Sequence, residues 1–237
     1  MLRQLSLFLG AYLLYQLVRG IVDGNDVAKA TWNAYKVISL EQTLHVFIEP
    51  GVQAWVNHTR WLMDLASSSY LNAHYVCTIG ALVWIYLRRN DSFYFVRNMF
   101  MVAMAFALVG YAVYPTAPPR LMPEWGFTDS IQQFTGITVE HGPSSALLNL
   151  YAAIPSMHVC FALMIGGPMA RLVKNPAAMV LWAIYPVFIT FVVIATGNHY
   201  LTDVVLGAIT AMASALLSKQ LLARARPDVW AFGQAPA

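Results

Sequence analysis

Long apolar runs, separated by short polar or proline-containing stretches, dominate the hydrophobic pattern of the chain. A helix needs about 20 mostly apolar residues to cross a bilayer. Helix-breaking residues mark several ends of these runs, namely Pro115, Pro155, Pro176 and Gly197-Asn198. The pattern predicts an all-α, polytopic membrane protein with six transmembrane helices, at residues 4–22, 66–87, 93–114, 155–173, 177–197 and 200–222.

Two longer segments connect these predicted spans. Residues 23–65 contain a predicted amphipathic helix, in which Glu41, His45 and Glu49 recur every fourth residue and would share one face. We expect this face to be solvated and the helix to lie among the lipid headgroups, although contact with a polar substrate stays open. Residues 115–154 are rich in Pro, Gly, Ser and Thr and are expected to form an extended loop with one short helix.

The composition favours one membrane domain over residues 1–237. The chain is 59% hydrophobic and 11% charged, whereas soluble domains carry about 25% charged residues. We expect a catalytic core at about 93–222, preceded by the first span and the interfacial helix at about 4–65. No small-residue cleavage pattern follows the first apolar run, so we expect it to remain as a span. The net charge of +3 is scattered, which argues against nucleic acid as a partner.

The distribution of charge predicts the orientation in the membrane. With six spans, nine of the fourteen basic residues fall on the side of the N-terminus: Arg3, Arg88, Arg89, Arg97, Arg171, Lys174, Lys219, Arg224 and Arg226. Basic loops stay in the cytoplasm. Both termini are therefore expected to be cytoplasmic, in a multi-pass protein of the cell membrane.

Two short stretches place a histidine at the predicted start of an apolar helix. The first is Pro155-Ser156-Met157-His158, and the second runs from Gly197 to Asp203 and contains His199. Asp203 follows His199 by four residues, about one helical turn. The six-span topology places both stretches, together with Arg120, at the extracytoplasmic face, so a single composite site is expected there.

The residue types of this composite site suit phosphoryl transfer. Displacement at phosphorus needs a nucleophile, a proton donor for the leaving oxygen and positive groups around the other oxygens. His199 paired with Asp203 supplies an imidazole with one free nitrogen, and His158 supplies a second imidazole. Arg120 offers a bidentate clamp. Ser156 is a natural N-cap, and the N–H groups of both helix starts could also hold phosphate.

Simpler roles remain open for each of these residues. The histidines could be hydrogen-bonded residues at the membrane border, Asp203 could only cap its helix, and Arg120 could pair with lipid headgroups. Ionisable groups at a membrane border are nevertheless functional candidates by default.

Other polar residues are candidates for substrate contact. Asn72 and His74 interrupt the apolar second span, where a helix–helix hydrogen bond is the alternative. Residues that flank the motifs could hydrogen-bond a polar head group: Tyr114, Asn149, Tyr151, Asn198 and Tyr200. Cys77 and Cys160 lie in apolar runs and are expected to be buried. The absence of CxxC and HExxH patterns predicts no metal site and no cofactor.

The two histidine stretches resemble a known family. Pro155-Ser156-x-His158 is similar to the second motif of the type 2 phosphatidic acid phosphatase superfamily, and His199-x-x-x-Asp203 to the core of its third. The resemblance implies a six-helix membrane core, no metal requirement and a phosphohistidine intermediate. It further implies that His199 is the nucleophile, Asp203 its orienting partner and His158 the general acid.

Departures from the family pattern point to one branch of it. The usual first motif begins with a lysine, but here the region from Tyr114 to Arg120 has none, and Val192-Val193 stand where the third motif usually has Ser-Arg. This pattern resembles the branch that contains inositol phosphorylceramide synthases and their bacterial relatives. The branch implies transfer of a phosphorylated head group, such as inositol phosphate, between lipids.

The sequence therefore predicts a membrane-embedded lipid phosphotransferase that acts on a phospholipid or polyprenyl phosphate and an alcohol or lipid acceptor. The main alternative is a phosphatase that hydrolyses phosphatidic acid or polyprenyl phosphates, which differs only in using water for the second step. A third alternative, in a different functional class, is a lipid-binding or transport protein without catalysis.

Overall fold

Helices make up almost all regular structure in the computed structural model, which describes residues 10, 12, 13, 15, 16, 27–136 and 151–219. Within these residues, extended backbone pairs only at one parallel bridge, between Thr116 and Ala152. The prediction of an all-α fold is confirmed.

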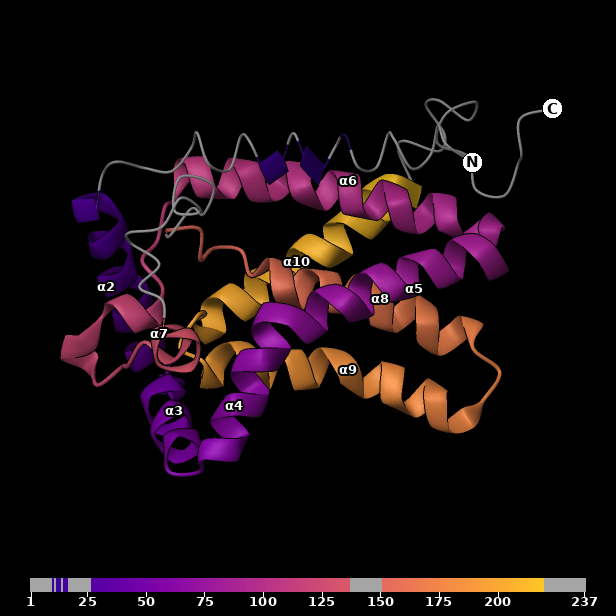
Figure 1. The fold of residues 1–237 in the computed structure, drawn as a ribbon. Coiled ribbons are helices and arrows are strands. Elements are labelled where there is room, and N and C mark those ends of the chain that lie inside the picture. The colour runs from indigo at the N-terminus through magenta and orange to yellow at the C-terminus, as the bar shows by residue number, and fades with distance from the viewer. Residues whose placement is uncertain (1–9, 11, 14, 17–26, 137–150, 220–237) are drawn as a thin grey trace.

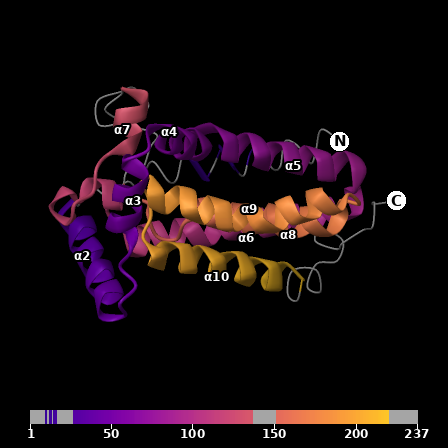
Figure 2. The same cartoon turned by 90° about the horizontal axis from the view of Figure 1, so that it is seen from below.

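Long helices run side by side and form a bundle (Figures 1 and 2). Helix α4 (Arg60–Ser68) continues through a π-helical turn, η1 (Ser69–Ala73), into α5 (His74–Arg88). The other bundle helices are α6 (Asn90–Val113), α8 (Met157–Leu172), α9 (Pro176–Ala195) and α10 (Leu201–Leu217).

Three helical stretches of the described residues are long and apolar enough to cross a membrane: 60–88, 90–113 and 176–195. They match the predicted second, third and fifth spans, while the fourth and sixth correspond to the shorter apolar helices α8 and α10. Of the predicted first span, only residues 10, 12, 13, 15 and 16 are described, and these are helical.

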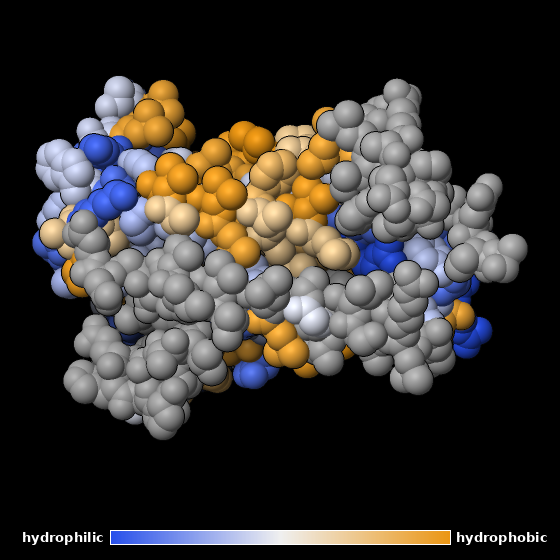
Figure 3. Space-filling view, turned by 90° about the horizontal axis from the view of Figure 1, so that it is seen from above, coloured by the Kyte–Doolittle hydropathy of each residue, from blue (hydrophilic) through white to orange (hydrophobic). Residues whose placement is uncertain are grey.

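The outward faces of the bundle are apolar. Large exposed hydrophobic side chains line α5 and α9: Val76, Ile79, Val83 and Leu87 on α5, and Val180, Leu181, Ile184 and Val187 on α9. Figure 3 shows hydrophobic residues along the middle of one face and hydrophilic residues towards its ends. This distribution fits a membrane protein whose middle contacts lipid tails.

Shorter helices cover one end of the bundle (Figure 1). They are α2 (Val27–Thr43), α3 (Glu49–Asn57), α4 and α7 (Ser130–Thr135). The loop from residue 115 onwards contains two 3₁₀ turns, η2 (Pro119–Leu121) and η3 (Pro123–Trp125), in addition to the predicted short helix. Asn149 lies outside the described residues.

The prediction that Glu41, His45 and Glu49 share one solvated face is wrong. Helix α2 ends at Thr43, and His45 adopts a left-handed backbone with φ of 58°, which breaks the helix before α3 begins. His45 is exposed, but Glu41 and Glu49 are buried. The carboxyl groups of these two glutamates can be buried because they accept hydrogen bonds from backbone N–H groups of α10.

Two glycines allow the start of α8 to lie tightly between neighbouring helices. A Cβ atom on Gly207 of α10 would collide with the backbone oxygen of Ser156. A Cβ atom on Gly110 of α6 would come within 2.9 Å of the Pro155 ring. These close approaches hold the segment that precedes His158 against the first turns of α10.

Candidate active site

A cavity of about 320 Å³ lies at the end of the bundle covered by the shorter helices. The helices α5, α6 and α8, the turn between α9 and α10 and the loop before α7 all contribute to its wall. Its polar lining includes Arg120, His74, His158, Asn198 and His199, and the remainder is largely aromatic and aliphatic. Three of the four residues proposed for catalysis or phosphate clamping therefore reach one cavity directly, and Asp203 contacts it through His199.

The turn between α9 and α10 fixes the position of His199. Gly197 ends α9 with a left-handed φ of 66°, a conformation that glycine adopts without steric cost. The N–H groups of Asn198 and His199 both donate to the carbonyl of Val193, at 3.0 and 3.2 Å. The backbone at the histidine is thus held before its side chain makes any contact.

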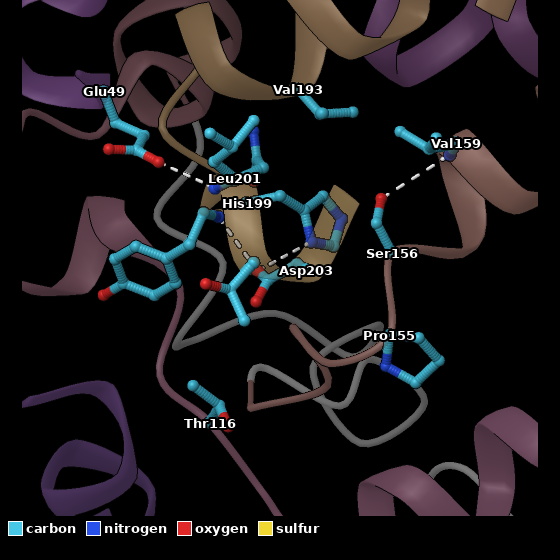
Figure 4. A network of polar contacts seen from close by, with 12 residues as sticks. Glu49, Thr116, Pro155, Ser156, Val159, Val193, His199, Leu201 and Asp203 are labelled. Atoms are coloured by element: carbon cyan, nitrogen blue, oxygen red, sulfur yellow. Dashed lines mark hydrogen bonds and ion pairs between the residues drawn. The ribbon is translucent and has the colours of Figure 1, made fainter. Parts of the chain in front are cut away.

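His199 and Asp203 form a buried pair (Figure 4). The Nδ1 atom of His199 lies 3.3 Å from Oδ2 of Asp203, and the two residues are 5% and 0% exposed. A carboxylate at this nitrogen favours the tautomer with the proton on Nδ1 and leaves a lone pair on Nε2. The pair therefore provides an imidazole whose second nitrogen is available as a nucleophile or a base.

His158 occupies the first turn of α8 and approaches His199 across the cavity. Ser156 caps this helix, since its Oγ accepts the N–H of Val159 at 3.5 Å. The His158 ring stacks on Tyr70, with centroids 4.2 Å apart, and its centroid lies 6.0 Å from that of His199. Two imidazoles from different helices thus face the same space.

Arg120 lies beside the turn that carries His199. Its backbone N–H donates to the carbonyl of Gly197 at 2.7 Å, and its Nε donates to Oδ1 of Asn198 at 3.0 Å. The Nη1 atom lies 3.9 Å from a carboxylate oxygen of Asp129. Asn198 is itself anchored, because its Nδ2 donates to the Thr196 hydroxyl at 2.8 Å. The guanidinium is therefore oriented along the cavity wall.

His74 lines the cavity and also joins two helices. Its Nδ1 lies 2.9 Å from the hydroxyl of Tyr185 on α9, and its ring centroid is 5.0 Å from that of His158. The predicted helix–helix hydrogen bond and the predicted cavity position are thus both present. Asn72, by contrast, is exposed and does not line the cavity, because it is two residues from His74 and side chains two apart on a helix do not share a face.

Three further candidates do not line the cavity. Tyr200 is fully buried and packs among the residues beneath the loop, because consecutive side chains in its extended backbone point to opposite sides and His199 faces the cavity. Tyr114 packs in the same apolar cluster. Ser156 is buried and serves as a helix cap. The prediction that these side chains touch the substrate is not supported by their positions.

The start of α10 is not open to phosphate, contrary to the sequence-based expectation. Its first N–H groups are already occupied by carboxylates. Asp203 accepts from Tyr200 at 2.9 Å, Glu49 from Leu201 at 2.7 Å and Glu41 from Thr202 at 2.6 Å. Phosphate oxygens would have to displace three hydrogen bonds there, so the start of α10 is not an available phosphate site.

Sequence reasoning missed the aromatic wall of the cavity, which comprises Tyr12, Tyr15, Tyr70, Tyr75, Tyr111 and Phe161. A signal existed for Tyr70, since it precedes His74 by four residues and so shares a helical face with it. Nothing local marked Tyr111 or Phe161, which lie within ordinary apolar runs. The roles of Glu41 and Glu49 were missed because their partners are more than 150 residues away.

Comparison with known families gives one result. The sequence model of a family described as the PAP2 superfamily matches residues 35–217, well over half of the chain. This range contains both histidine stretches, Arg120 and both buried glutamates. No curated protein and no solved structure shows significant similarity to the chain.

Proposed function

The chain belongs to the PAP2 superfamily, and we propose that it is a membrane-embedded phosphotransferase that works through a phosphohistidine at His199. Membership of the superfamily supports phosphatase or phosphotransferase activity in general. The observation that carries the proposal is the buried His199–Asp203 pair, which faces His158 across a cavity that Arg120 also lines.

The first step is attack of His199 Nε2 on the phosphorus of the donor lipid. The N–P bond forms while the bond to the leaving oxygen breaks, and His158 gives that oxygen a proton. Asp203 holds the Nδ1–H and offsets the positive charge that develops on the ring. Arg120, oriented by Asn198, balances the charge on the other phosphoryl oxygens.

The second step is attack of an acceptor oxygen on the same phosphorus. His158, now neutral, takes the proton of the acceptor hydroxyl, and the N–P bond breaks to regenerate His199. With an alcohol or lipid acceptor the reaction is transfer, and with water it is hydrolysis. The proposed reaction needs no metal ion.

The lining of the cavity favours transfer over hydrolysis. Around the histidines the wall is formed by Tyr70, Tyr111, Met157 and Phe161. Such a wall offers surface to an organic acceptor. We therefore propose a phospholipid or polyprenyl phosphate as donor, with inositol phosphate as one head group that could move, and an alcohol or lipid as acceptor. Hydrolysis of a lipid phosphate is the second candidate.

The proposed topology has six spans, cytoplasmic termini and an extracytoplasmic site. Basic residues support it, because Arg88, Arg89, Arg171 and Lys174 lie at helix ends away from the cavity, where positive charge marks the cytoplasmic side. At the cavity end, Trp32, Trp55 and Trp61 are exposed on α2, α3 and α4. Exposed tryptophans are typical of the membrane–water interface, which fits an interfacial role for these helices.

Product analysis by mass spectrometry distinguishes the candidates. Purified protein is incubated with phosphatidic acid, phosphatidylinositol or a polyprenyl phosphate, each with and without a diacylglycerol or ceramide acceptor, and His199→Ala serves as control. A new acceptor-linked phospholipid is expected from the wild type alone. Free phosphate or free phospho-head-group in equal yield without acceptor would establish the hydrolase instead. No turnover of any donor, with His199→Ala indistinguishable from the wild type, would favour a lipid-binding protein.

A further inference from the structure

Two glutamates from the N-terminal helices hold the first turn of α10. Oε1 of Glu49 accepts the N–H of Leu201 at 2.7 Å, and Oε1 of Glu41 accepts the N–H of Thr202 at 2.6 Å. Their side chains come from α3 and α2, far from α10 in the sequence. The turn that they hold comes shortly after His199 and contains Asp203. A movement of this turn would therefore also move the His199–Asp203 pair.

The second oxygen of each glutamate is buried without a hydrogen-bond partner in the part of the chain that the structure describes. Oε2 of Glu41 and Oε2 of Glu49 are both buried, and neither has a hydrogen-bond partner among the described residues. The residues are 1% and 0% exposed. Two ionised carboxylates in such a place would repel each other and leave two buried acceptors unsatisfied. One proton between the two oxygens removes both penalties.

We propose that Glu41 and Glu49 are positioning residues that share one proton and together hold the start of α10, and thereby the His199–Asp203 pair, in its reactive geometry. This inference rests on the proposed function, because it concerns the same histidine. An ionised carboxylate also suits the site, since the partial positive charge at a helix N-terminus favours negative charge nearby.

The surroundings support a shared proton at neutral pH. Burial, and then the charge of Glu41, raise the pKa of Glu49 to about 8. Among the described residues, the titratable groups that interact electrostatically with the pair are acidic or phenolic: Asp203 interacts with Glu41, and Tyr200 with both glutamates. Helix α9, which packs against α3, contains no charged residue. The basic side chains on the neighbouring short helices are exposed: Lys29, Lys36, His45, His58 and Arg60.

Loss of the shared proton has a predictable effect. As the pH rises through about 8, the folded protein gains a second negative charge beside Asp203. Because the unfolded glutamate has already lost its proton above about pH 4.5, the folded state binds more protons between these values. Stability therefore falls as the pH rises through this window, and activity should fall with it on the alkaline side.

Amide substitution tests the shared proton. Glu49→Gln keeps an acceptor for Leu201 and offers its NH₂ to Glu41, which imitates the protonated pair. We expect Glu49→Gln to keep activity at pH 7 within about threefold, whereas Glu49→Ala loses about tenfold or more, because Leu201 and Glu41 lose their partner. Glu41→Gln should resemble Glu49→Gln. The double Gln variant should resemble the Ala variant, because its two NH₂ groups face each other. Asp64→Asn, an exposed acid on α4, is the matched control.

Two pH measurements separate positioning from simple packing. In Glu49→Gln the alkaline loss of activity should disappear, and the melting temperature should depend less on pH between 5 and 8 than in the wild type and Asp64→Asn. The melting experiment needs no turnover, so it tests the shared proton even if the proposed reaction is wrong. Unchanged pH profiles in Glu49→Gln, or activity at pH 7 as low as in Glu49→Ala, would overturn the inference.

A wild-type measurement covers the case in which the variants do not fold. Infrared titration of the intact protein in detergent should show a protonated carboxyl band at pH 7 that disappears with a midpoint near pH 8. Asp203→Asn protein, measured in parallel, excludes Asp203 as the source of that band. A spectrum without a protonated carboxyl band at pH 7 would show that the two glutamates share no proton.

Discussion

Oδ2 of Asp203 makes contacts with both the His199 side chain and the backbone of its own helix start. It lies 3.3 Å from His199 Nδ1 and accepts the N–H of Tyr200 at 2.9 Å. The backbone contact fixes the carboxylate, and the carboxylate in turn fixes the imidazole. Helix capping and orientation of the His199 ring, which were alternatives for Asp203 at the level of sequence, are therefore two consequences of one geometry.

Asp203→Asn should separate these two consequences. The amide oxygen can still accept the Tyr200 N–H, so the melting temperature should change little. The same oxygen can still accept the Nδ1–H, but the amide has no negative charge to offset the positive charge that develops on the His199 ring, so kcat should fall by about 10³–10⁴-fold. Steady-state kinetics and thermal unfolding of the same preparation check both halves. Full activity in Asp203→Asn would rule out the assigned pair.

His158→Ala should reveal its role through the leaving group. Removal of the proton donor should slow turnover of an alkyl phospholipid by about 10²–10⁴-fold. Release of the first equivalent of nitrophenol from a nitrophenyl phosphate analogue needs no proton donor and precedes the step in which His158 acts as base, so its rate should be affected far less. His45→Ala, which removes an exposed histidine, is the control. Equal losses on both substrates would indicate that His158 acts by packing on Tyr70 and not by proton transfer.

Arg120 and Asn198 should behave as a coupled pair. Arg120→Lys removes the planar fork and the bond from Nε to Asn198, so KM should rise and kcat should fall. Asn198→Ala should weaken binding in the same direction, and the double variant should lose less than the two single losses combined. A coupling of about 0.5–3 kcal/mol in a double-mutant cycle is expected. If the losses of the two single variants simply add in the double variant, Arg120 and Asn198 act independently. Arg60→Lys, at an exposed site, is the control for replacing a guanidinium group by an amine.

Gly207→Ala should destabilise the protein and reduce activity together. The added Cβ meets the backbone oxygen of Ser156, which cannot move without displacing the start of α8. We expect a loss of about 1–3 kcal/mol in stability, typical of overpacking. Gly80→Ala, where nothing lies within 4 Å of the new Cβ, should leave the melting temperature unchanged or raise it. Equal melting temperatures of the two variants would argue against the tight crossing of α8 and α10.

The sequence predicted the parts of the site that depend on helix ends. Long apolar runs located the long helices, and the alternation of the predicted spans between the two membrane sides placed Arg120, His158 and His199 at one end. Ser156 was recognised as a cap from its residue type and position. These inferences succeeded because they need only the order of the helices and local rules for helix termini.

Sequence reasoning failed where the role of a residue depends on the direction of its side chain or on a partner far away in the sequence. Tyr200 and Asn72 lie close to cavity residues in the sequence, but the extended backbone at Tyr200 and the two-residue offset of Asn72 from His74 direct their side chains elsewhere. Glu41 and Glu49 looked like a solvated face, because a spacing of four residues assumes an unbroken helix. The left-handed backbone at His45 and the N–H groups of α10, more than 150 residues away, are not visible in that spacing.

The most direct test of the account is detection of the covalent intermediate on His199. Wild-type protein is mixed with donor lipid in the absence of acceptor, quenched at alkaline pH, where phosphohistidine survives, and digested for mass spectrometry. The account predicts a phosphoryl or phospho-head-group adduct on His199 that disappears when acceptor is added and never forms in His199→Ala. Turnover of donor by His199→Ala at the wild-type rate, with no adduct on the wild type, would contradict it.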